Sequence, residues 1–309
     1  MRVVFAGTPH IAVPTLTAIV AAGHQVAAVL TQPDAPGKRG RSLVSSHVSD
    51  AARELEIPVL TPVKASDPEV AAAIRDLDAD VAAVVAYGQI LRPELLGATR
   101  LGWVNLHFSV LPAWRGAAPV QRAIMAGDDV TGASTFLIDE GLDTGPVIGT
   151  LTERIHPTDT AGELLERLAS MGAGLMVHSL EALVGGYAAP MSQGEDGVSY
   201  AHKLTREDAY VAWEFPAHIV DRQVRGVTPA PGAWTTLPDG TVAKIGPVRP
   251  RSGPGLPPGQ VRGADEVLVG TGTHPVALTW IAPAGRKPMD ATAWLRGARL
   301  SEAATLGEA

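Results

Sequence analysis

Short apolar runs alternate with a helical pattern through the first part of the chain. Val3 to Ala6 is apolar, a helical stretch follows from Ile11 to Ala22, and a second apolar run covers Val26 to Leu30. Further runs of strand length cover Val81 to Ala86 and Gly102 to His107. This order of strand, helix and strand predicts an α/β domain built on a Rossmann-like parallel sheet. Open sheets of this kind bind ligands at the carboxyl ends of their strands.

The pattern changes in the second part of the chain. A long helical pattern covers residues 162–184, and the polar stretch from Ser192 to Gly197 then predicts a linker. Beyond it, Pro and Gly are dense and separate short apolar runs such as Thr241 to Ile245 and Glu266 to Val269. That spacing predicts a small β-barrel or β-sandwich. We expect a first domain over residues 1–189, a linker over 190–206 and a second domain over 207–309.

The composition agrees with two globular domains. The chain has 309 residues, 46% of them hydrophobic, which is enough for two ordinary cores. It contains no cysteine, so a disulfide framework, a thiolate nucleophile and a Cys-ligated zinc site are excluded. The opening residues lack the long apolar stretch of a secretory leader, and no later segment approaches membrane-spanning length. We therefore expect a cytoplasmic protein that does not contact membranes.

Charge is unevenly distributed along the chain. The net charge is −7, which argues against a protein that wraps nucleic acid by electrostatics. From Arg206 onward there are 11 basic and 10 acidic residues, so the first 205 residues carry −8. The acidic first part nevertheless holds one compact basic segment, Lys38, Arg39 and Arg41, between glycines. Charge alone favours a solvated loop for this segment and ordinary variation between domains for the asymmetry.

Two polar side chains lie at the end of one predicted strand. Asn105 and His107 are two positions apart, so on a strand they point to the same face. Ser109 and Pro112 follow at once, which ends the strand and places the pair at its carboxyl end. On its own, this pattern favours a hydrogen-bonded structural histidine beside a turn-forming asparagine.

An acidic loop offers a partner for this histidine. Asp139, Glu140 and Asp143 lie within five residues, and glycines stand two positions to either side of Asp143. A carboxylate delivered to His107 would fix its ring and stabilise the imidazolium. A solvated acidic turn and a calcium loop are the alternatives, although the spacing of an EF-hand is not met. The chain has no G-x-G-x-x-G, no G-x-x-x-x-G-K-[ST] and no metal-ligand spacing of histidines, so we expect neither a nucleotide cofactor nor a metal.

Six blocks occur in a fixed order along the chain. They are Phe5-Ala6-Gly7-Thr8-Pro9, Thr31-Gln32-Pro33-Asp34 with the basic segment after it, Val85-Ala86-Tyr87-Gly88, Asn105 to Pro112, Arg115 to Gln121, and Gly141-Leu142-Asp143-Thr144-Gly145. Together they resemble the methionyl-tRNA formyltransferase family over essentially the whole chain. The Asn-x-His, Ser-x-Leu-Pro and Asp core is shared with formyltransferases that act on glycinamide ribonucleotide or amino sugars. It therefore sets the reaction more than the acceptor.

The resemblance implies a reaction and roles for the core residues. The formyl group of 10-formyltetrahydrofolate would pass to the free amino group of initiator methionyl-tRNA, for the initiation of translation. Asn105 and His107 would donate hydrogen bonds to the developing oxyanion, and Asp143 would hold His107 and raise its basicity. Four residues would line the folate site: Ser109, Val110, Leu111 and Pro112. No metal is implied.

The resemblance also implies how tRNA is bound. Lys38, Arg39 and Arg41 would bind the acceptor end of the tRNA. The second domain would be an OB-like β-barrel that contacts tRNA, because Pro231-Gly232-Ala233-Trp234 and Pro283-Ala284-Gly285-Arg286-Lys287 look like the family's C-terminal module. Initiator methionyl-tRNA and folate are the expected partners, and a monomer is the expected state.

Three positions depart from the family pattern, and three other functions compete. Phe108 and Val110 stand where the family more often has a small residue and leucine, and Ser42 stands where a second lysine is common. The competing functions are a folate-dependent formyltransferase with a small-molecule amine acceptor, a formyl-folate hydrolase and a non-catalytic RNA-binding module. The first two leave the basic segment and the added C-terminal domain unexplained. The third would make the ordered core motifs incidental.

Overall fold

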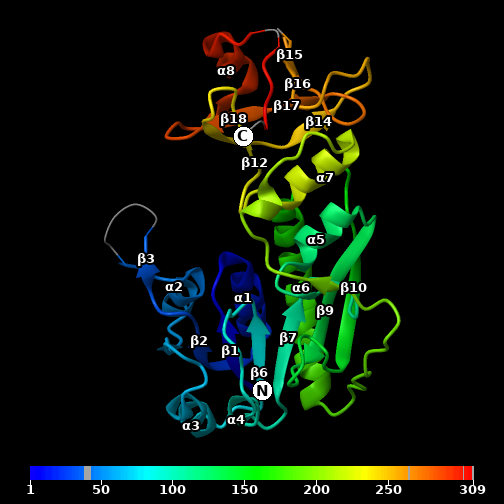
Figure 1. The fold of residues 1–309 in the computed structure, drawn as a ribbon. Helices are drawn as coiled ribbons and strands as arrows, with labels where there is room; N and C mark the ends of the chain where they lie inside the picture. The colour runs from blue at the N-terminus through cyan, green and yellow to red at the C-terminus, as the bar shows by residue number, and fades with distance from the viewer. Residues whose placement is uncertain (38–42, 264, 302, 308–309) are drawn as a thin grey trace. The chain divides into compact units, whose positions relative to one another are not determined.

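The computed structural model describes residues 1–37, 43–263, 265–301 and 303–307 (Figure 1). The chain forms two compact units that interleave along the sequence. The first comprises Met1–Gly116, Val130–Arg154 and Leu165–Tyr200, and the second comprises Ala117–Asp129, Ile155–Leu164 and Ala201–Ala309. The predicted division into residues 1–189, 190–206 and 207–309 stays a prediction. None of the described helices is both long and apolar enough to span a membrane.

A seven-stranded sheet forms the first unit (Figure 1). Its spatial order is β10 (Val147–Arg154), β9 (Val130–Leu137), β7 (Trp103–His107), β6 (Val81–Val85), β1 (Arg2–Gly7), β2 (Gln25–Leu30) and β5 (Val59–Leu60). The predicted α/β class is confirmed. The sheet is mixed, however, because β9 runs antiparallel to both β7 and β10. A short loop can join antiparallel strands such as β9 and β10, whereas a parallel pair needs a long crossover.

The central strands are apolar because they are covered on both faces. All five residues of β6 are buried, as are the last five of β1, so neither strand alternates between apolar and polar residues. The remaining elements before Ala201 include the helical segments η1 (His10–Ala12), α1 (Val13–Ala21), α2 (His47–Glu54), α3 (Pro68–Asp76), α4 (Pro93–Leu96) and α6 (Ala161–Val184). The short strands are β3 (Ala35–Pro36), β4 (Leu43–Val44), β8 (Arg115–Gly116) and β11 (Tyr200–Ala201).

Helix α6 covers one face of β7. A Cβ atom at Gly172 would lie 2.8 Å from Leu106, so the absence of a side chain lets the helix approach the strand closely. Leu106 therefore points toward α6. Because side chains alternate along a strand, Asn105 and His107 point to the opposite face of the sheet.

The second unit contains two four-stranded antiparallel sheets. The first has the order β12 (Trp234–Thr236), β13 (Val242–Ile245), β18 (Trp280–Pro283) and β19 (Met289–Asp290), and the second has β14 (Val248–Pro250), β17 (Val276–Leu278), β16 (Val267–Val269) and β15 (Val261–Arg262). Its helical segments are α5 (Pro119–Ala126), η2 (Glu207–Ala209), α7 (Ala217–Gly226) and α8 (Ala291–Ala298). The predicted β-rich C-terminal part is confirmed.

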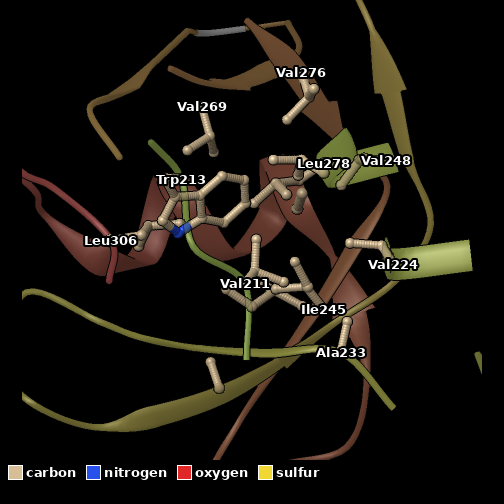
Figure 2. Packing of buried hydrophobic residues seen from close by; sticks show 14 of the residues in the cluster. Val211, Trp213, Val224, Ala233, Ile245, Val248, Val269, Val276, Leu278 and Leu306 are labelled. Atoms are coloured by element: carbon tan, nitrogen blue, oxygen red, sulfur yellow. The ribbon is translucent and has the colours of Figure 1, made fainter. Parts of the chain in front are cut away.

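One hydrophobic core joins these two sheets (Figure 2). The indole of Trp213 lies among Val211, Leu278 and Leu306, and its Nε1 donates a 3.0 Å hydrogen bond to Thr235. Val224 of α7 belongs to the same core. The C-terminal sheets and α7 are thus packed as one body.

Candidate active site

His107 is the last residue of β7 and is almost completely buried. Its Nε2 lies 2.8 Å from the carbonyl oxygen of Trp114. A carbonyl can only accept, so Nε2 carries the hydrogen in this bond. The neutral ring then has its lone pair on Nδ1, which lies 3.6 Å from Oδ2 of Asp143. The ring edge is also packed against Phe136, with the ring centres 6.4 Å apart.

Asp143 comes from the loop that joins β9 to β10. Its Oδ2 accepts a 2.7 Å hydrogen bond from the peptide N–H of Gly116. Its backbone adopts a positive φ of 53°, which Asp tolerates better than most residues. The structure therefore brings together His107 and Asp143, as the sequence predicts, although the 3.6 Å between Nδ1 and Oδ2 is too long for a hydrogen bond.

The pKa of His107 is lower than its usual value of 6.5, because burial penalises the charged imidazolium. The carboxylate of Asp143 and the bond to Trp114 oppose this effect but do not overcome it. Asp143 thus acts on the basicity of His107 in the predicted direction, while the net shift is downward. The resting ring is neutral, which suits a proton acceptor.

Asn105 lies two positions before His107 on β7 and is partly exposed. Throughout the part of the chain that the structure describes, its side-chain amide makes no hydrogen bond. By contrast, the one N–H of neutral His107 is already bonded to Trp114. Of the two predicted oxyanion donors, Asn105 is therefore the one whose donor is available to a substrate.

The turn after β7 is tied to β9 by hydrogen bonds. The hydroxyl of Ser134 accepts from the N–H of Leu111 at 3.1 Å and donates to the carbonyl of Ser109 at 2.8 Å. The hydroxyl of Ser109 donates to Ala113, and the carbonyl of Val110 accepts from the N–H of Ala113. These groups have internal partners, so the turn is a rigid stop for the strand. The folate-lining role of residues 109–112 stays a prediction.

Hydrogen bonds between its own residues hold the conformation of the acidic loop. Oδ1 of Asp139 accepts from the N–H of Gly141 at 3.0 Å and from the hydroxyl of Thr144 at 2.7 Å. In the described ranges, no three His, Asp or Glu side chains are placed to share a metal ion. Asp139 therefore organises the loop that presents Asp143.

Sequence reasoning missed Gln193, which lies in the predicted linker. Its amide nitrogen donates 2.8 Å hydrogen bonds to the carbonyls of Asp143 and Gly145. Its oxygen accepts two hydrogen bonds from the buried guanidinium of Arg115. A glutamine in a polar stretch such as Ser192 to Gly197 carries no local signal for this role. The predicted tRNA-binding residues Lys38, Arg39 and Arg41, and the departure at Ser42, lie outside the described residues.

Comparison with known proteins identifies the family. The model of the formyl transferase family matches residues 1–180, and that of the formyl transferase C-terminal domain matches residues 203–299. The methionyl-tRNA formyltransferase of Mycobacteroides abscessus is 54% identical over 97% of this chain and 98% of its own length. That of Thermobifida fusca is 54% identical over the full length of both chains. The chain belongs to the methionyl-tRNA formyltransferase family.

Solved structures at low sequence identity share the fold of this methionyl-tRNA formyltransferase family member. An N-formyltransferase from Helicobacter canadensis, solved with folinic acid and dTDP-3-aminofucose, has a TM-score of 0.68 at 18% identity and covers 92% of this chain and 99% of its own. HypX from Aquifex aeolicus, solved with tetrahydrofolic acid, has a TM-score of 0.68 at 17% identity over 96% of this chain and 47% of its own. The fold is thus shared with proteins of low sequence identity.

Proposed function

We propose that this protein transfers the formyl group of 10-formyltetrahydrofolate to the amino group of initiator methionyl-tRNA. The observation that carries the proposal is the pairing of His107 with Asp143 at the end of β7, in a chain 54% identical over its full length to methionyl-tRNA formyltransferases. The acceptor follows from the relatives, because the core motifs are shared with enzymes that use other amines. Transfer to a small amine and release of formate to water remain the alternatives to test.

Asn105, His107 and Asp143 have separate roles in the proposed reaction. The donor supplies the formyl carbon, which it carries on its N10 nitrogen. Asn105 donates a hydrogen bond to the oxygen that becomes negative when the amine attacks, since its amide has no other partner among the described residues. His107 accepts the proton that the attacking amine loses, at Nδ1. Asp143 then faces a positive imidazolium at 3.6 Å and stabilises it. The oxyanion re-forms the carbonyl as the bond from the formyl carbon to N10 breaks, and N10 leaves as the amine of tetrahydrofolate with the proton that His107 returns.

Two exposed apolar side chains follow strands of the sheet that carries the site. Leu142, next to Asp143, is 57% exposed, and Ile90, shortly after the end of β6, is 83% exposed. We propose that Leu142, an exposed apolar side chain beside Asp143, covers an aromatic ring such as that of a folate. We propose that the turn from Ser109 to Pro112 supports this region through its shape.

We also propose how tRNA is held. Lys38, Arg39 and Arg41 bind the acceptor end, and residues 207–309 form a domain that contacts the tRNA as well. On strands β13 and β14 of that domain, Lys244 and Arg249 are exposed while their neighbours Ile245 and Val248 are buried. We further propose that the protein acts as a monomer in the cytoplasm. Its mass in solution can be checked by sedimentation.

One assay separates the proposal from its alternatives. The purified protein is mixed with 10-formyltetrahydrofolate and with charged initiator tRNA, glycinamide ribonucleotide or no acceptor, and formylated product and free formate are both measured. We expect formylmethionyl-tRNA and little product in the other two reactions. Formate release at the same rate without tRNA would establish the hydrolase instead. Preferential formylation of glycinamide ribonucleotide would establish the small-molecule acceptor.

A further inference from the structure

The side-chain amide of Gln193 binds the active-site loop through its nitrogen and Arg115 through its oxygen. Its two N–H groups are taken up by the carbonyls of Asp143 and Gly145, each at 2.8 Å. Its oxygen accepts from Nε and Nη2 of Arg115 at 3.1 and 2.7 Å. An amide whose donors and acceptor are all occupied has one orientation, so Gln193 is a fixed point beside Asp143.

The loop that Gln193 holds has little conformational freedom of its own. Asp143 has a positive φ of 53°, which is less stable than the usual backbone regions for a residue with a side chain. A side chain at Gly145 would overlap the carbonyl of Leu137. The direction of the Asp143 carboxylate depends on this backbone conformation. Two hydrogen bonds to the carbonyls of residues 143 and 145 stabilise it from one side, and the Gly116 N–H fixes the carboxylate from the other.

Arg115 connects this support to His107. Its guanidinium is buried, and across the described residues the only side-chain acceptor it has is the neutral oxygen of Gln193. A buried cation without a carboxylate partner adds little stability, which points to a geometric role. Its neighbours in the chain hold the two reacting side chains: the carbonyl of Trp114 binds His107, and the N–H of Gly116 binds Asp143.

We propose that Gln193, supported by Arg115, is a positioning residue that sets the Asp143 carboxylate against the imidazole of His107. This inference rests on the proposed function and adds to it a residue from the segment between the two predicted domains. Gln193 reaches Asp143 only through its backbone carbonyl, so its effect falls on the rate of the chemical step and not on substrate binding.

Two substitutions at residue 193 test this role. Gln193→Leu removes all four hydrogen bonds at similar volume. Gln193→Glu retains an acceptor for Arg115 but cannot donate to the carbonyls of Asp143 and Gly145, so it separates the loop contacts from the arginine contact. Gln223→Leu is the matched control, because the amide of Gln223 likewise donates to two backbone carbonyls, those of Asp208 and Tyr210, far from the reacting groups in sequence.

For both Gln193 variants we expect kcat to fall by about tenfold to a hundredfold, as a small misplacement of a reacting group does. The KM values for folate and tRNA should stay within about twofold of the parent protein. The control should lower the melting temperature by a similar amount while kcat is retained. If Gln223→Leu loses as much kcat as Gln193→Leu, or if both Gln193 variants turn over like the parent protein, the positioning role is wrong.

An NMR titration tests the positioning role of Gln193 in the absence of tRNA. The imidazole signal of His107 is assigned by its loss in His107→Gln. We expect its titration midpoint to move to lower pH in Gln193→Leu and in Asp143→Asn alike, because both changes remove the carboxylate from its place. A midpoint equal to that of the parent protein in Gln193→Leu would overturn the inference. If the parent protein formylates no tRNA, the proposed function fails and the titration still decides the role of Gln193.

Discussion

The peptide N–H of Gly116 donates a 2.7 Å hydrogen bond to the carboxylate of Asp143. The same oxygen, Oδ2, faces the imidazole of His107 at 3.6 Å. A backbone N–H has no side-chain rotamer that could turn it away, so this bond fixes the carboxylate oxygen beside the imidazole. The Asp143 carboxylate is thereby held next to the ring that we propose as the proton acceptor.

From this arrangement we expect His107 and Asp143 to act as one unit. His107→Ala should lower kcat by about a hundredfold or more, as the loss of an acid–base group typically does. Asp143→Asn keeps the shape but removes the charge that stabilises the imidazolium, so it should also lower kcat. The double variant should cost little more than the worse single change, since such effects are not additive. Steady-state rates with methionyl-tRNA decide this, and near-normal turnover in either single variant would remove that residue from the mechanism.

The depressed pKa of His107 predicts a pH dependence of stability. Burial lowers the pKa of the folded state below the 6.5 of an exposed histidine, so the unfolded chain binds the extra proton first as the pH falls. The contribution of His107 to stability is therefore present above about pH 6.5 and is lost as the pH drops through the folded-state pKa.

The comparison of parent protein and His107→Gln isolates this effect. Urea unfolding of both between pH 5 and 8 should show a difference in the free energy of unfolding that is constant above about pH 6.5 and shrinks or reverses below it. Carboxylates such as Asp80, whose pKa is lowered mainly by Arg100, also stabilise the fold less as the pH falls. This loss is the same in both proteins, so it cancels in the difference. A difference that stays the same at all pH values would contradict the burial of a neutral ring.

The sequence predicts where Asn105 and His107 lie because the signal for their position is local. Asn105 and His107 share a face through the two-residue period of a strand, and the turn after them marks the carboxyl end of β7. Asp143 needed the family resemblance as well, since an acidic loop with glycines has several meanings.

The rest of the site depends on contacts between distant segments. Strand β9 is buried over six residues, yet its sequence contains Thr131, Gly132 and Ser134 in place of a long apolar run. Gly132 is required because a side chain there would overlap the carbonyl of Leu151 on β10. Gln193 is similar, because its partners lie about 50 and 78 residues away in sequence. No pattern within either segment reveals such partners.

A glycine in the second unit carries a prediction about stability. Gly246 follows β13, and its N–H donates a 3.0 Å hydrogen bond to the carbonyl of Trp280 on β18. A Cβ atom at this position would overlap the indole of Trp280. Gly246→Ala should therefore lower the free energy of unfolding by about 1–3 kcal/mol, the usual effect of forcing extra atoms into a packed site.

Gly297→Ala is the control for this change. Gly297 lies in α8 and a Cβ there meets no atom within 4 Å, so alanine should be neutral or stabilise by up to about 1 kcal/mol through helix propensity. Thermal and urea unfolding of the two variants should differ in sign. Equal stability of Gly246→Ala and the parent protein would show that the indole can move aside freely.

Arg39 belongs to the basic segment outside the described residues, and its prediction rests on charge. The first 205 residues carry a net charge of −8 and repel polyanions, so binding must be concentrated where the local charge is reversed. Arg39→Ala should raise the KM for tRNA and reduce the salt dependence of binding by about one phosphate contact, with folate affinity unchanged. Arg75→Ala, an exposed arginine of α3, is the control of equal charge. An unaltered salt slope in Arg39→Ala would remove this residue from the tRNA contact.

The exposed cations of β13 and β14 test the role of the second unit. Lys244 is exposed between two buried residues and Arg249 is exposed next to the buried Val248, so their removal leaves the core intact. If this surface contacts tRNA phosphates, the double change to alanine should weaken tRNA binding and lower the salt slope by about two contacts, while folate affinity and the rate of a saturated reaction are retained. Removing Arg75 and Arg92, two exposed arginines of the first unit, changes the net charge equally. If the salt slope of tRNA binding falls to the same extent in both double variants, the effect is one of general charge. If the slope is unchanged in the Lys244 and Arg249 double variant, this face of the second unit has no role in binding.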